Sequence, residues 1–215
     1  MSGALCLQGG NEFTTDCREM DTEVLERAGD GPVAVIAGAA RVGSDYDGAS
    51  SRARRHYEGL GADVVVVPDP RIDLAAAVAG LTDDVALVVL PGGSPASLRE
   101  VLSGDVEDRL RELYDNGTAI SGASAGAMVL CERMVRPGGS NGGDVVDGLG
   151  LASGLALPHW SPGSDRTWPI PDDLDLWGLP ECGGVVIDGG ANPVAVGHGE
   201  PSCRFRGVWK QLPRA

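Results

Sequence analysis

Short runs of Val, Leu, Ile and Ala alternate with longer amphipathic segments along the first part of the chain. Glycine or proline bounds most of these runs, which is typical of strands buried on both faces of a parallel sheet. The runs predict strands at residues 4–7, 33–37, 64–67, 85–90 and 119–120. Helical periodicity between the runs predicts helices at residues 16–27, 48–59, 74–81, 95–102, 105–116 and 125–131. This alternation indicates an α/β fold, in which ligands bind outside the carboxyl ends of the strands.

The pattern changes after Cys131. Residues 136–150 are rich in Gly, Asp and Ser and are predicted to form a surface loop. Residues 167–178 are rich in Pro, Asp and Trp and are predicted to form an irregular loop. A short strand is expected at residues 155–158, between these two loops.

Two apolar runs close to the end of the sequence predict an antiparallel hairpin. They lie at residues 185–187 and 194–196 and flank a turn-forming segment, so we place them at one edge of the sheet. Residues 203–209 are expected to add a further strand. The sequence therefore predicts one domain over residues 1–215, built as a three-layer α/β/α sandwich with a mostly parallel sheet.

The composition narrows the class of protein. The formal net charge is -14 in 215 residues, which argues against nucleic acid or an anionic membrane as a partner. No segment is long and apolar enough to span a membrane, and the first residues show no signal-peptide pattern. The five cysteines form no C-x-x-C pair, so neither a disulfide framework nor a zinc site is indicated. We expect a cytoplasmic protein with free thiols and no cofactor or metal, and a homodimer is compatible with the sequence.

Ser124 lies in the most informative segment, which has the sequence AISGASAGAMVL over residues 119–130. The order of apolar run, G-x-S-x-G and small-residue run is typical of a nucleophile elbow, where a strand turns sharply into a helix and presents a serine. The flanking glycines leave room for the tight turn, and the helix directs free N–H groups at a bound substrate. This segment predicts a serine hydrolase.

A serine nucleophile needs a base, and the chain has three histidines. His56 lies in an Arg-rich amphipathic helix and is expected at the surface. His159 follows the strand at residues 155–158 directly, so it is our first choice, and His198 is the reserve. Spacing leaves the orienting acid open among four candidates: Asp144, Asp147, Asp165 and Glu181.

Several segments together resemble the serine peptidases that include alpha-aspartyl dipeptidase (peptidase E) and cyanophycinase, whose sheet is related to that of the class I glutamine amidotransferases. The resemblance runs from about Leu5 to about Leu212. The elbow, GASAGA at residues 122–127, matches most closely. The other matched segments are QGGNE at 8–12, LPGG at 90–93, LGL at 149–151 leading to PHW at 158–160, and GLPE at 178–181.

The resemblance implies a triad of Ser124 as nucleophile, His159 as general base and then acid, and Glu181 as the residue that orients His159. It also makes the backbone N–H groups of Gly93 and Ala125 candidates for an oxyanion hole. Further residues of the matched segments are expected to contact substrate or to lie beside it, and these are Gly92, Ser94 and Trp160. Glu12 is expected at the surface.

Two segments that border the substrate site depart from the family pattern. Ser94 and Pro95 stand where members often carry a polar amide or carboxylate side chain, and the residues after His159 lack the closely spaced arginines of cyanophycinases. The resemblance therefore implies hydrolysis of a small peptide or isopeptide amide without implying aspartyl specificity. Three other hypotheses stay open: a glutaminase that uses Cys131, a non-catalytic binding module, and an acyl-transfer enzyme of a biosynthetic pathway.

Overall fold

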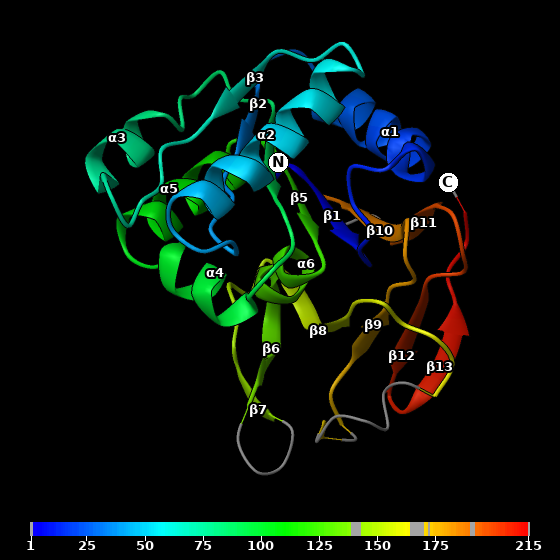
Figure 1. Cartoon of the computed structure of the whole chain (residues 1–215). Coiled ribbons are helices and arrows are strands. Elements are labelled where there is room, and N and C mark those ends of the chain that lie inside the picture. The colour runs from blue at the N-terminus through cyan, green and yellow to red at the C-terminus, as the bar shows by residue number, and fades with distance from the viewer. Residues whose placement is uncertain (1, 139–142, 164–169, 172, 190–191, 215) are drawn as a thin grey trace.

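The computed structural model describes residues 2–138, 143–163, 170–171, 173–189 and 192–214, and it contains two sheets (Figure 1). The first sheet has seven strands in the order β11-β10-β1-β5-β4-β2-β3. Their bounds are Val194–Gly197 (β11), Gly183–Asp188 (β10), Ala4–Gln8 (β1), Ala119–Ala123 (β5), Leu87–Leu90 (β4), Val33–Val35 (β2) and Val64–Val66 (β3). Strands β1, β5, β4, β2 and β3 pair in parallel, whereas β10 and β11 are antiparallel. The predicted fold class and the antiparallel edge hairpin are confirmed.

Helices cover both faces of the first sheet because its strands are apolar on both sides. The helices are Arg18–Ala28 (α1), Ser44–Glu58 (α2), Leu74–Ala79 (α3), Pro95–Val101 (α4), Asp105–Asp115 (α5) and Ala125–Leu130 (α6), with a 3-10 turn at Thr15–Cys17. Alternate residues of β1, β2 and β4 belong to separate core clusters. One cluster joins Leu5 and Leu7 of β1 to α3, α4, α5 and α6, and the other joins Cys6 of β1 to α1 and α2. This period of two produces the three predicted layers.

A second, six-stranded sheet lies below the first in Figure 1. Its strands, in order, are Val208–Gln211 (β13), Ser202–Phe205 (β12), Leu176–Gly178 (β9), Ala152–Leu157 (β8), Cys131–Pro137 (β6) and Gly143–Asp147 (β7). Leu155, Ala156 and Val135 of this sheet belong to the same core cluster as α4 and α6. The second sheet therefore packs against the helical layer that carries the elbow.

The loop prediction for residues 136–150 is wrong in part. Strands β6 and β7 form an antiparallel hairpin in which Met134 faces Val146 and Val135 faces Val145. These apolar cross-strand pairs stabilise the hairpin despite the Gly, Asp and Ser around it. The second predicted loop, residues 167–178, likewise contains a strand, β9, and its residues 167–169 and 172 lie outside the described part of the chain.

Helix α2 buries His56, so the prediction of a surface position was wrong. His56 stands one turn after Ala53 on the buried stripe of the helix, and its Nε2 lies 2.7 Å from Asp21 Oδ2. Gln8 Nε2 donates to Asp21 Oδ1 at 2.7 Å and to Ser121 Oγ at 3.0 Å. Asp21 is therefore a buried carboxylate whose oxygens are held by polar groups from β1 and α2.

Replacing Asp21 with alanine is expected to lower the free energy of unfolding by about 3 kcal/mol, because it leaves buried polar groups of Gln8 and His56 without their partner. Urea denaturation measures this change. The matched control is Asp188→Ala, which breaks the more exposed ion pair with Arg27 and is expected to cost less than about 1 kcal/mol. Equal losses in the two variants would contradict a structural role for the buried carboxylate.

Within the described ranges, we find no helix with the length and apolar character that crossing a membrane requires.

Candidate active site

Ser124 stands at the turn between β5 and α6 with φ 49° and ψ −106°. A non-glycine residue rarely adopts this backbone conformation, and such strain is common at functional positions. Glycine is required on both sides of the turn. A Cβ on Gly122 would lie 2.5 Å from the carbonyl carbon of Gly126, and a Cβ on Gly126 would lie 2.2 Å from the carbonyl oxygen of Leu90. The predicted nucleophile elbow is thus present in the backbone.

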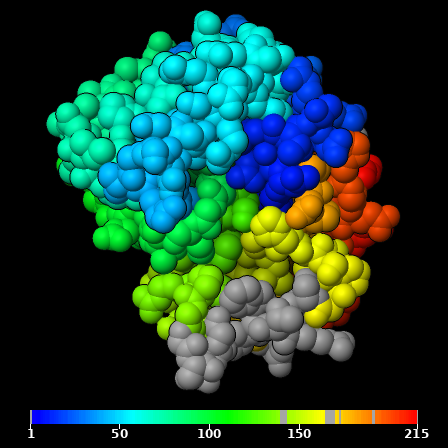
Figure 2. Space-filling view, in the orientation of Figure 1, coloured from blue at the N-terminus to red at the C-terminus, as the bar shows by residue number. Residues whose placement is uncertain are grey.

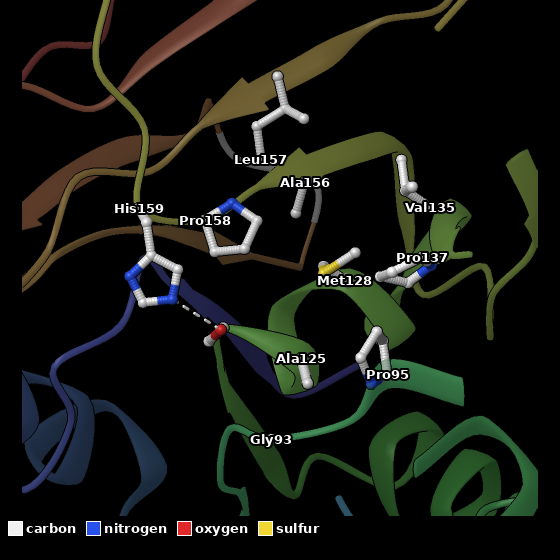
Figure 3. Close-up of a pocket in the computed structure, with 11 residues that line it drawn as sticks. Gly93, Pro95, Ala125, Met128, Val135, Pro137, Ala156, Leu157, Pro158 and His159 are labelled. Atoms are coloured by element: carbon white, nitrogen blue, oxygen red, sulfur yellow. Dashed lines mark hydrogen bonds between the residues drawn. The ribbon is translucent and has the colours of Figure 1, made fainter. Parts of the chain in front are cut away.

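His159 follows β8 and also has a positive φ, 52°. Its Nε2 lies 3.0 Å from Ser124 Oγ, which is within hydrogen-bond reach. The dashed line in Figure 3 marks this contact. His159 therefore occupies the place that a general base for Ser124 requires.

Glu181 follows β9 and places Oε1 3.2 Å from His159 Nδ1. The side chains of both residues are more than half exposed, 52% for His159 and 60% for Glu181. The carboxylate can accept a hydrogen bond from Nδ1–H and so leave the lone pair of Nε2 directed at the serine. Because both side chains are exposed, water reaches this pair.

Three consecutive carbonyl groups hold the backbone segments of these residues together. The Ser124 N–H donates to the carbonyl of Gln8 at 3.0 Å, and the His159 N–H donates to that of Gly9 at 2.8 Å. The N–H of Cys182, the residue after Glu181, donates to the carbonyl of Gly10 at 3.0 Å. One tripeptide, residues 8–10, therefore positions all three segments. In Figure 2, the blue N-terminal part of the chain adjoins yellow and orange parts that are distant in sequence.

Two backbone N–H groups beside Ser124, for which the described residues supply no acceptor, are the candidates for an oxyanion hole. Ala125 is the first residue of α6, so its N–H has no partner within the helix. Gly93 has φ 142°, and no acceptor for its N–H is found among the described residues. A Cβ on Gly93 would lie 2.6 Å from the carbonyl oxygen of Ala39, so this turn requires glycine. Both residues line the same cavity as Ser124.

None of the three expected substrate contacts is among the described residues that line this cavity, and Trp160 lines a separate one with Pro162 and Pro180. Ser94 Oγ caps α4 by accepting from the Ser97 N–H at 3.2 Å. Trp160 stacks on Trp209 with ring centroids 5.1 Å apart. Gly92 lies beside the serine, since a Cβ there would be 3.2 Å from Ser124 Cβ.

Glu12 and Gly10 are two residues near the site whose contacts the sequence did not predict. Glu12 Oε1 accepts a hydrogen bond from the Gly92 N–H at 2.9 Å, so Glu12 is half-buried and anchors the glycine turn beside Ser124. Gly10 lies against the ring of His159, because a Cβ there would be 2.3 Å from His159 Cε1. Both belong to the QGGNE segment, whose clustered glycines were the available signal.

Two of the other three acid candidates form ion pairs away from His159, and the third lies outside the described residues. Asp144 pairs with Arg136, and Asp147 pairs with Arg133, across the β6–β7 hairpin. Asp165 lies outside the described residues. The reserve base, His198, follows β11 and does not line the Ser124 cavity as far as the described residues define it.

Cys131 lies at the end of α6 and is fully buried. Burial raises the pKa of its thiol from 9.0 to about 12. A thiol with so high a pKa stays protonated at neutral pH, whereas the nucleophile of a glutaminase is a thiolate. Cys131 therefore does not supply the reactive thiolate that the glutaminase hypothesis requires.

Iodoacetamide at pH 8 is expected to modify native Cys131 at least about 100-fold more slowly than unfolded Cys131, because only the thiolate reacts and the buried thiol does not ionise. Peptide mass spectrometry over a time course measures the rates. Cys203 is only partly buried and serves as the internal control. Modification of Cys131 as fast as Cys203 in folded protein would contradict this expectation.

A search of the described residues finds no group of three or more His, Cys, Asp or Glu side chains placed to hold a metal ion.

The family model that matches this chain and the two solved structures compared with it below are all described as peptidases. The sequence model of peptidase family S51 matches residues 5–172. A peptidase from an acI-B1 Actinobacterium superposes with a TM-score of 0.81 at 22% identity, over 100% of this chain and 95% of that one. A putative peptidase E protein from Listeria monocytogenes EGD-e superposes with a TM-score of 0.64 at 17% identity, over 93% of this chain and 100% of that one. No curated protein matches the sequence.

Proposed function

Because the chain belongs to peptidase family S51, we propose that it is a serine peptidase that hydrolyses a small peptide or isopeptide amide through an acyl-enzyme on Ser124. The observation that carries the proposal is the contact chain from Ser124 Oγ to His159 Nε2, 3.0 Å, and from His159 Nδ1 to Glu181 Oε1, 3.2 Å. Serine is a weak nucleophile by itself, and this arrangement supplies the base and the group that orients the base.

In the proposed acylation step, Ser124 Oγ attacks the carbonyl carbon of the scissile amide while His159 Nε2 takes the hydroxyl proton. The negative charge on the carbonyl oxygen is stabilised by the N–H groups of Gly93 and Ala125. His159 then gives its proton to the leaving nitrogen as the C–N bond breaks, and the acyl group remains on Ser124.

In the proposed deacylation step, the amine product has left and a water molecule takes its place. His159 Nε2 removes a proton from this water as it attacks the ester carbonyl, and returns the proton to Ser124 Oγ when the ester bond breaks. Glu181 accepts the hydrogen bond from Nδ1–H throughout and stabilises the imidazolium that forms in each step.

A fluorophosphonate probe tests the proposal directly, because it reacts with an activated serine and needs no knowledge of the substrate. We expect the probe to label the native protein at Ser124, with loss of fluoride, and not to label Ser124→Ala. Ser103→Ala is a matched control, because its hydroxyl donates to the Glu100 carbonyl on the surface. Absence of labelling in folded native protein, or equal labelling of Ser124→Ala, would refute a nucleophilic serine.

A further inference from the structure

The cavity beside Ser124 has a volume of about 390 Å³ and an apolar lining. This volume is at the lower end of the range for small-ligand sites. Apart from Ser124 and His159, its lining consists of Gly93, Pro95, Ala125, Met128, Val135, Pro137, Ala156, Leu157 and Pro158. Among the residues that the structure describes, none with a formal charge at neutral pH contributes to this lining. The cavity is therefore suited to an uncharged group.

The cavity walls come from four elements. Pro95 begins α4, Met128 lies one turn into α6, Val135 and Pro137 belong to β6, and Leu157 ends β8. Figure 3 shows Met128, Val135 and Pro137 at the opposite end of the cavity from His159. The second sheet therefore builds much of the wall farthest from the histidine.

The position of His159 decides which part of a substrate enters this far end. His159 has to protonate the leaving nitrogen, so the leaving group lies on the histidine side of Ser124. The acyl group then extends the other way, past Ala125 toward Met128 and Pro137. The side chain of the acyl-donating residue consequently has access to the apolar end.

We propose that this cavity selects substrates whose acyl-donating residue has an apolar side chain, such as Leu, Met or Phe, and disfavours an aspartyl residue. The proposal rests on Ser124 being the nucleophile of the proposed function. An aspartate side chain at the far end of this cavity would lose its water without gaining a cation or a side-chain hydrogen-bond donor from Met128, Val135 or Pro137. The two arginines of β6, Arg133 and Arg136, are ion-paired with Asp147 and Asp144 and do not line the cavity.

Diphenyl phosphonate analogues of single amino acids test this inference, because they vary the acyl-side residue while the leaving group is phenoxide in every case. Ser124 Oγ forms a bond to phosphorus, phenoxide leaves, and the serine proton passes to His159. We expect the leucine and phenylalanine analogues to inactivate the enzyme at least about 100-fold faster than the aspartate analogue. This ratio corresponds to about 2.7 kcal/mol.

The fluorophosphonate probe, used in parallel, distinguishes a failure of the proposed apolar selection from a failure of the proposed serine peptidase function. If the fluorophosphonate labels Ser124 and the aspartate analogue reacts as fast as the leucine analogue, the apolar selection is wrong while the serine peptidase stands. The same holds if Ser124 is labelled and none of the amino-acid analogues reacts. If the fluorophosphonate itself fails, the proposed function is refuted.

Two variants that place opposite charges at one cavity position provide the second test. Pro137 is exposed at the end of β6, so Pro137→Lys and Pro137→Glu should both fold. We expect the lysine variant to raise the rate of the aspartate analogue relative to leucine by about 10-fold and the glutamate variant to lower it. An unchanged ratio in both folded variants would overturn the placement of the acyl side chain at this end of the cavity.

Discussion

Alanine at Ser124 or at His159 is expected to lower kcat by about 10⁶-fold, and the double variant should be no slower than either single variant. The two side chains act as one unit, because a serine without its base and a base without its serine are equally unable to form the acyl-enzyme. Residual turnover in these variants would come from the oxyanion-hole N–H groups and from the binding and orientation of the substrate. The fall in kcat is measured by hydrolysis of an amino-acyl p-nitroanilide. The derivative used is the one that the native enzyme cleaves fastest.

His198→Ala is the matched control for His159→Ala. It removes a histidine that follows a strand of the first sheet and does not line the cavity in the described part of the chain. Native activity is expected in this variant. Two results would contradict the assignment: a loss in His198→Ala comparable with that in His159→Ala, or single-variant losses that multiply in the double variant.

Gly10→Ala is expected to lower kcat/KM by at least about 100-fold, since a displacement of a catalytic group by about 1 Å has a cost of this order. The added Cβ would lie 2.3 Å from His159 Cε1 and 2.8 Å from Nδ1, so the ring has to move. Movement of the ring lengthens its contacts with Ser124 and Glu181 together. The p-nitroanilide assay gives kcat/KM, and the rate of fluorophosphonate labelling should fall in parallel.

Gly138→Ala controls for the backbone strain in this experiment. Gly10 has φ 131° and Gly138 has φ 135°, so alanine is strained to a similar degree at both positions. Among the described residues, however, nothing lies within 4 Å of a Cβ at Gly138. Activity lost equally in the two variants would assign the effect to strain and would leave the contact with the His159 ring without a function.

The first sheet could be predicted from the sequence because local pattern determines it. Strand β4, for example, is the continuous apolar run LVVL and ends in a glycine-rich turn, and burial on both faces requires such runs. The second sheet was mostly missed for the opposite reason. Strand β9 has three residues, and its pairing with β8 and β12 depends on partners distant in sequence. Propensity over so short a segment carries little information.

The site shows the same division between local and distant information. Ser124 was identified from its own neighbours, because the elbow is a local turn that requires small residues around the serine. Spacing could not select Glu181 among four acids, since its contact with His159 depends on where β9 and the segment after it lie. The family resemblance supplied that choice. The misplacement of His56 was avoidable, because His56 shares the buried stripe of its helix with Ala49 and Ala53.

The attachment of three segments to residues 8–10 has a consequence for the order of events during protein synthesis. Residues 8–10 are synthesised well before Glu181, Cys182 and strand β10, which pairs with β1. A growing chain that has reached Ser124 has neither the histidine nor the carboxylate in place, and β1 still lacks one neighbour. Under the proposed function, amide hydrolysis therefore cannot begin before the chain has been synthesised past Glu181 and β10 and these segments have folded onto residues 8–10.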